Sequence, residues 1–84
     1  MKANIMKNIE AHRRLGNWLK EKRVEAGLSQ SQLADLIGRH KTFIGKYEAG
    51  RRLEICEFVR ISVTLGADPH EGVKLVMDGK PQRG

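Results

Sequence analysis

The chain has 84 residues, a length that predicts one small domain with a modest core and no separate catalytic domain. Sixteen Lys and Arg against ten Asp and Glu give a formal net charge of +6, which favours an anionic partner such as nucleic acid or an acidic membrane surface. No apolar run approaches the roughly 20 residues that span a bilayer, and the basic start lacks the apolar stretch of a signal peptide, so we expect a cytoplasmic protein without a membrane partner.

The N-terminal part of the chain predicts a polar segment followed by a first helix. Residues 1–11 are polar and Asn-rich, and we interpret them as an N-terminal arm or a weakly ordered helical extension. A helix is expected from Arg13 to Ala26, and Gly27 supplies the left-handed residue that ends it. The apolar residues that fall on one face of this helix are Leu15, Trp18, Leu19 and Ala26.

Two short helices joined by a tight turn are expected next. The first starts after Ser29, whose hydroxyl can accept a hydrogen bond from a free amide, and Gln32 completes a capping box. Gly38 breaks this helix. The second begins near Lys41 and ends at Gly50, another left-handed stop. In the helix that starts after Ser29, the residues that point inward are Leu33, Ala34 and Ile37.

Two further helices complete an all-α domain over residues 12–79, followed by a short basic tail at residues 80–84. The fourth helix is expected from about Glu54 to Leu65, with Gly66 as its end. Its predicted apolar stripe comprises Ile55, Phe58, Val59, Ser62 and Leu65, flanked by Ile61 and Val63. A helix-start signature of Asp68, Pro69 and Glu71 predicts a fifth helix that runs to about Met77.

The third helix has two contrasting faces. At 100° per residue, one side carries Phe43, Ile44 and Tyr47, and the other carries Lys41, Thr42, Gly45, Lys46 and Ala49. Small side chains allow close approach to base edges, while Lys and Thr can contact guanine acceptors, phosphates or a thymine methyl group. Gly45 lowers helix propensity by up to about 1 kcal/mol, which close approach to DNA would explain; packing of Gly45 against a neighbouring element is the alternative.

The segment from Leu28 to Gly50 reads LSQSQLADLIGRHKTFIGKYEAG. With the following RRLEICEFVRISVTLGADP, it resembles the helix-turn-helix of the Cro and phage-repressor family, also called the XRE family, over roughly Leu15 to Pro69. The residues that carry the resemblance are Leu28, Ser29, Gln30, Leu33, Ala34, Gly38, Ile44, Glu48 and Gly50. It implies a five-helix, lambda-repressor-like DNA-binding domain whose second and third helices form the helix-turn-helix.

The resemblance assigns Lys41, Thr42 and Lys46 to base contacts, on the face where Gly45 would allow close approach. The alternatives are that Lys41 contacts only phosphate and that the two lysines are merely solvated. It assigns Gln30 to a phosphate, where the helix N-terminus reinforces the site. His40 replaces the family's usual Ser or Thr and is expected to bond a phosphate. The arginines that would extend the contact along the DNA backbone are Arg39, Arg51 and Arg52.

The resemblance also implies a structural ion pair between Arg23 and Glu48, which would orient the third helix. A two-fold homodimer is expected because one recognition helix reads only a few base pairs. The surplus apolar surface of the fourth and fifth helices is the expected seam of this dimer. Helix five presents Val73, Val76 and Met77 on one face and Leu75 on another. Either face can form the dimer seam, or both can serve the monomer alone.

The sequence therefore predicts a sequence-specific transcription regulator that binds double-stranded DNA, a repressor or autoregulator acting as a dimer on an inverted repeat. The alternative is a protein-interaction module, such as an antitoxin, that binds an unknown partner protein. Cys56 is the only cysteine, and His12, His40 and His70 lie far apart in the sequence. No Ser-His-Asp, Cys-His or paired-carboxylate pattern appears, so we expect no enzyme, no metal and no cofactor.

Overall fold

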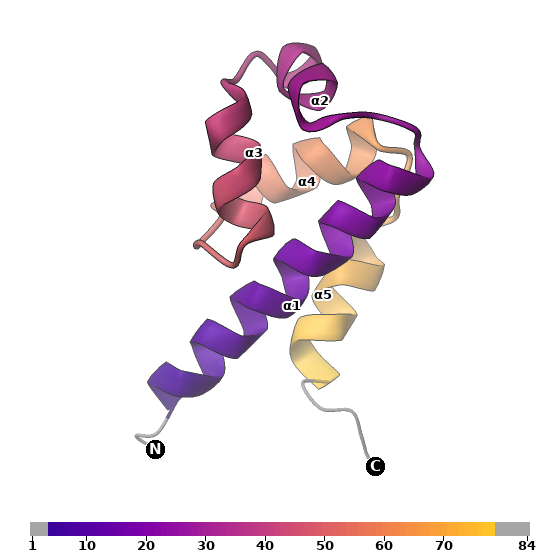
Figure 1. Ribbon diagram of the computed structural model, residues 1–84. Coiled ribbons are helices and arrows are strands. Elements are labelled where there is room, and N and C mark those ends of the chain that lie inside the picture. Colours follow the sequence, from indigo (N-terminus) through magenta and orange to yellow (C-terminus); the bar gives the residue numbers. More distant parts are fainter. Residues whose placement is uncertain (1–3, 79–84) are drawn as a thin grey trace.

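The computed structural model describes the backbone of residues 4–78 and the side chains of residues 9–77, and these residues contain helices but no strand (Figure 1). The helices are α1 (Asn4–Glu25), α2 (Gln30–Ile37), α3 (Lys41–Glu48), α4 (Ile55–Thr64) and α5 (Pro69–Asp78). The predicted five-helix, all-α class is confirmed for this part of the chain. Residues 1–3 of the predicted arm and the predicted tail at 80–84 lie outside the described residues.

Helix α1 is longer than the sequence indicates at its start. It begins at Asn4 rather than near Arg13, so residues 4–11 form a helical extension of the domain. Figure 1 shows its first turns running past the other helices. At the other end the helix stops at Glu25, and Gly27 adopts the expected left-handed conformation with φ 76°. Ala26, which the pattern places on the apolar face, is exposed because the helix has already ended.

The ends of α2 and α3 follow the local signals in the sequence. The Ser29 hydroxyl accepts a hydrogen bond from the Gln32 amide at 3.0 Å, and the Gln32 side chain accepts one from the Ser29 amide at 2.8 Å. Gly38 ends α2 at φ 70°, and Gly50 has φ 106° just after α3. Both glycines occupy a left-handed region that other residues rarely adopt, so the turn between the two helices and the exit from α3 are fixed locally.

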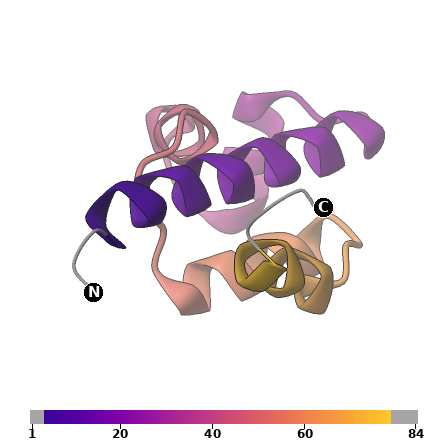
Figure 2. The same ribbon diagram turned by 90° about the horizontal axis from the view of Figure 1, so that it is seen from below.

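The core lies where α1 meets the helix-turn-helix on one side and the last two helices on the other. Its buried apolar residues are Leu19, Leu33, Ala34, Ile37, Ile44, Tyr47, Phe58 and Ile61. Seen from below, α3 lies on one side of α1 and α4 and α5 lie on the other, while α2 passes behind α1 (Figure 2). The partly buried Leu15 and Trp18 extend the core along α1. Helix α3 packs against α1 and α2.

The buried face of α4 differs from the predicted stripe. Phe58, Ile61 and Ser62 are buried, whereas Ile55 is 60% exposed and Val59 is also exposed. Ile61, which the pattern places at the flank, is thus a central core residue. Apolar side chains occur on several sides of α4, so the sequence alone does not define one stripe, and contact with α2 and α5 decides which of them is buried. Ile55 and Val59 of the predicted stripe are therefore part of the apolar surface that α4 leaves exposed on the monomer.

Candidate nucleic-acid interface

The two faces of α3 are separated as the sequence predicts. Ile44 and Tyr47 are buried in the core, and Phe43 packs at its edge with its ring 5.5 Å from that of Tyr47. The opposite side is open to solvent and forms a shallow hollow. The residues that line this hollow are Gln30, Lys41, Thr42, Gly45, Lys46, Ala49 and Arg51. We call this set of residues the outer face of α3, and it combines the groups predicted to contact bases with two of those predicted to contact phosphate.

The outer face of α3 carries an excess of positive charge. Lys41 and Lys46 are exposed on the helix, and Arg51 and Arg52 are exposed directly after it. Glu48 is the only acidic residue between positions 36 and 53. Because Glu48 is paired with an arginine, its negative charge does not offset these four cations at the surface. An anionic ligand would therefore be attracted to this side of the molecule.

Gly45 leaves the middle of the outer face open. A methyl group built at this position would have only the side-chain amide of Gln30 nearby, at 3.9 Å. Its backbone is ordinary α-helix, with no positive φ that would require glycine. Neither tight packing nor backbone conformation therefore explains the glycine, and the alternative that it packs closely against a neighbouring element does not hold. What the glycine does provide is a flat backbone surface, without a side chain, that is accessible from the solvent.

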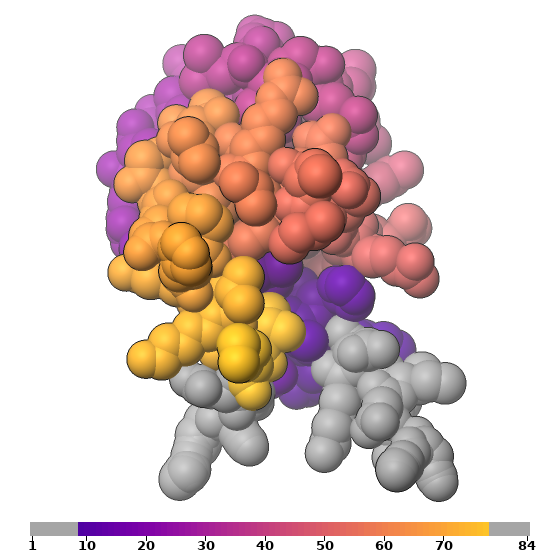
Figure 3. All heavy atoms as spheres, turned by 180° about the vertical axis from the view of Figure 1, so that it is seen from behind, coloured from indigo at the N-terminus to yellow at the C-terminus, as the bar shows by residue number. Residues whose placement is uncertain are grey.

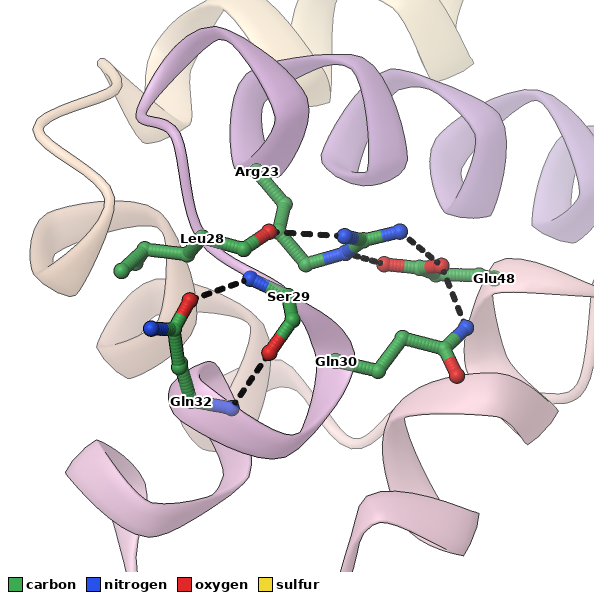
Figure 4. Close-up of polar contacts among 6 residues, drawn as sticks. All are labelled: Arg23, Leu28, Ser29, Gln30, Gln32 and Glu48. Carbon is green, nitrogen blue, oxygen red and sulfur yellow. Dashed lines mark hydrogen bonds and ion pairs between the residues drawn. The ribbon is translucent and has the colours of Figure 1, made fainter.

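Arg23 and Glu48, the two residues expected to pair, form a bidentate contact between α1 and the end of α3 (Figure 4). Arg23 Nε lies 2.7 Å from Glu48 Oε2, and Arg23 Nη2 lies 3.1 Å from Oε1. Only 10% and 4% of the two side chains are exposed. The hydrogen bond to Glu48 raises the pKa of Arg23, so the guanidinium stays charged.

Two further hydrogen bonds join this ion pair to the start of α2. Arg23 Nη1 donates to the carbonyl of Leu28 at 2.8 Å, and Gln30 Nε2 donates to Glu48 Oε1 at 3.0 Å. Figure 4 shows Gln30 reaching from α2 to Glu48 on α3. Gln30, which the sequence predicts as a phosphate contact, thus has one of its two amide hydrogens engaged within the protein. The network ties α1, α2 and α3 together at the back of the outer face.

Arg39 and His40 both have partners inside the protein. The Arg39 guanidinium lies 4.0 Å from the centre of the Phe43 ring and 3.5 Å from Glu57 Oε2, which links the turn to α4. His40 is the N-cap residue of α3, and its Nδ1 accepts a hydrogen bond from the Thr42 amide at 3.1 Å. The histidine therefore supplies the cap that Ser or Thr would otherwise give. Neither of these protein contacts was part of the sequence prediction.

Gly16 is a positioning residue that the sequence analysis missed. An alanine methyl group at this position would overlap the carbonyl oxygen of Tyr47 and lie 3.3 Å from the carbonyl carbon of Glu48. The backbones of α1 and α3 thus touch where Gly16 has no side chain. A lone glycine inside a helical pattern, one turn before Leu19, is the signal that could have indicated this close approach.

The residues predicted for the dimer seam lie away from the outer face. Val73, Val76 and Met77 are exposed, and Met77 has 77% of its surface accessible. They line an apolar hollow together with Ala11, His12, Leu15, Leu53, Ile55 and Phe58. In Figure 3, part of α1 is visible in indigo beside the yellow end of α5. Leu75 does not line this hollow and is half-buried.

Comparison with protein families gives one match, to the helix-turn-helix domain, over residues 14–72 and thus more than half of the chain. Comparison with curated proteins gives no match. None of the helices in the described part of the chain is long and apolar enough to cross a membrane. In the same part of the chain, no group of three or more His, Cys, Asp or Glu side chains is placed to hold a metal ion.

Proposed function

Because the chain belongs to the helix-turn-helix domain family, we propose that it is a sequence-specific transcription regulator whose helix α3 enters the major groove of double-stranded DNA. The outer face of α3 is the observation that carries this proposal. It is small, positive and open, and the opposite side of the same helix is buried in the core. A helix held in this way can lie against base edges without loss of core contacts.

The proposed contacts fall into two groups. Lys41, Thr42 and Lys46 contact base edges, and Gly45 allows the backbone of α3 to come close to them. The side chains proposed to contact the DNA backbone are Gln30, Arg39, His40, Arg51 and Arg52. Arg51 and Arg52 are exposed, while Gln30 and Arg39 would contact phosphate with the N–H groups that their protein partners leave free.

We further propose that the protein is a repressor or autoregulator that binds an inverted repeat as a two-fold dimer. The exposed apolar residues Val73, Val76 and Met77 support a seam through α5, because a monomer gains little from leaving them in water. Such a dimer would place its two α3 helices about 34 Å apart, one turn of DNA. Leu75 belongs to the same proposed region but is already half-buried within the monomer.

The dependence of duplex DNA binding on salt tests the proposed function. Each neutralised phosphate releases counterions and contributes about −0.9 to the slope of log affinity against log salt. Arg52→Ala should lower the magnitude of this slope by about one unit and weaken binding to all sequences alike. Arg60→Ala, an exposed arginine on α4, is the matched control and should leave the slope unchanged.

An affinity for duplex DNA that does not change with salt would contradict the proposal. Equal slopes of log affinity against log salt for the wild-type protein and Arg52→Ala would contradict it as well. The first result would favour the alternative from the sequence, a module whose partner is another protein and which contributes little affinity for DNA.

A further inference from the structure

The start of α3 contains a hydrogen-bond arrangement that bears on the base preference of Thr42. His40 Nδ1 accepts the backbone amide of Thr42 at 3.1 Å and lies 2.8 Å from the hydroxyl oxygen of the same residue. His40 caps the helix with an extended backbone, φ −82° and ψ 149°, and both side chains are exposed. One ring nitrogen thus contacts both the amide and the hydroxyl of Thr42.

The chemistry of the imidazole ring fixes the direction of both hydrogen bonds. A ring nitrogen either carries a hydrogen or offers a lone pair, and Nδ1 must offer a lone pair because it accepts from a backbone amide. The contact between Nδ1 and the Thr42 oxygen then requires the hydroxyl to be the donor. In this arrangement the hydrogen of the His40 ring is on Nε2. The Thr42 hydroxyl keeps only its lone pairs for a partner outside the protein.

Base edges in the major groove differ in what they offer to such a group. Adenine and cytosine present an amino donor, at N6 and N4, whereas guanine and thymine present carbonyl acceptors. We propose that His40 determines the specificity of Thr42: it holds the hydroxyl as an acceptor, so that Thr42 selects adenine or cytosine over guanine or thymine at the base it contacts. This inference rests on the proposed function, because it requires Thr42 to face a base.

Protonation of His40 reverses the arrangement. With hydrogens on both ring nitrogens, Nδ1 can no longer accept the Thr42 amide and instead donates to the hydroxyl oxygen. The hydroxyl hydrogen is then free to point at a guanine or thymine acceptor. The charged groups adjacent to His40 are Lys41 and Arg39, and Arg39 is paired with Glu57 from α4. The preference of Thr42 therefore depends on which ring nitrogens of His40 carry a hydrogen.

The test is selection of duplexes with randomised half-sites, followed by sequencing, for the wild-type protein and for variants at His40 and Thr42. The wild-type protein should prefer adenine or cytosine at one position by about fivefold. His40→Asn supplies a cap oxygen that can accept in place of Nδ1, so it should keep the preference, whereas His40→Ala supplies no acceptor and should lose it. Thr42→Val should show no preference.

Nuclear magnetic resonance of the free protein measures which His40 nitrogen carries the hydrogen, without any DNA. A hydrogen on Nδ1 would overturn the inference while leaving the proposed function intact. A His40→Ala preference equal to that of the wild type, or a wild-type preference for guanine or thymine at that position, would also overturn it. A protein that selects no sequence would contradict the proposed function itself, and the hydrogen on Nε2 would still be measurable.

Discussion

Among the residues that the structure describes, Arg23 and Glu48 form the ion pair with the least solvent-exposed side chains. Their side chains are 10% and 4% exposed, whereas the pair between Arg14 and Glu10 on the surface of α1 is 32% and 59% exposed. Surface pairs contribute little because water already solvates both charges. Removing one member of a buried pair leaves the other charge without solvent or partner. Stability should therefore respond very differently to the loss of each arginine.

Arg23→Ala should lower the free energy of unfolding by about 3–5 kcal/mol, because Glu48 keeps only the weaker hydrogen bond from Gln30. Arg14→Ala is the matched control and should cost about 0–1 kcal/mol. Chemical denaturation of both variants measures the difference. Equal losses, or a double-mutant cycle without coupling between positions 23 and 48, would show that the pair does not stabilise the fold.

Between elements, the contact of α1 with α3 sets the position of the outer face. Gly16 brings the two backbones together, and the Arg23–Glu48 pair joins the same two helices farther along α1. Both contacts lie behind α3, on the side opposite the hollow formed by Lys41, Thr42 and Gly45. A displacement of α3 from α1 would therefore move the groups proposed to contact bases without changing any of them.

Gly16→Ala should destabilise the domain, although alanine favours helix more than glycine by about 1 kcal/mol. The added methyl group meets the Tyr47 carbonyl, and such overpacking typically costs about 1–3 kcal/mol. Asn17→Ala, at the exposed neighbouring position, is the control and should not lower stability. Thermal melting shows whether the cost of overpacking exceeds the gain in helix propensity. A Gly16→Ala protein that melts above the wild type would contradict the close contact.

The parts of the fold that the sequence predicts correctly are those that depend on neighbouring residues. The capping box of Ser29 and the left-handed Gly38 fix the ends of α2 with groups only a few residues apart. The burial of Ile61 on α4 depends instead on the helices that pack against it, which an almost continuous apolar pattern does not reveal. The face of α3 was predictable because its two sides differ sharply in polarity, whereas the contact at Gly16 depends on a second helix.

For the whole molecule, the proposed regulator has two surfaces with different properties. The outer face of α3 is polar and positive, whereas the hollow beside α5 is lined largely by apolar side chains. Val73, Val76 and Met77 give the second surface its exposed apolar character. Separate surfaces would allow two copies of the chain to associate through α5 while both α3 helices remain free for DNA, as a two-fold arrangement requires.

Met77→Glu should yield a folded monomer, because the charge enters the proposed seam at a side chain that is 77% exposed in the single chain. Leu75→Glu should instead lower the melting temperature, because Leu75 is half-buried and a carboxylate there loses solvation. Sedimentation equilibrium and thermal melting measure the two effects. A wild-type protein that is monomeric at high concentration, and remains so on a single asymmetric DNA site, would refute the dimer.

Substitution at Gly45 tests the proposed contact between α3 and DNA most directly. Gly45→Glu places a carboxylate in the middle of the outer face, yet its first side-chain carbon has room, with Gln30 3.9 Å away. Helix propensity should even improve, by up to about 1 kcal/mol. Val63→Glu makes the same change in charge on α4, at a side chain that is 63% exposed, and serves as the control.

The measurement is the affinity of both variants for the selected duplex at one salt concentration, with thermal melting as the check on folding. We expect Gly45→Glu to remain folded and no longer to bind, because its carboxylate would meet base edges and phosphates in the groove. Val63→Glu should bind like the wild type. A folded Gly45→Glu protein that binds the duplex as tightly as Val63→Glu would contradict the placement of α3 against DNA.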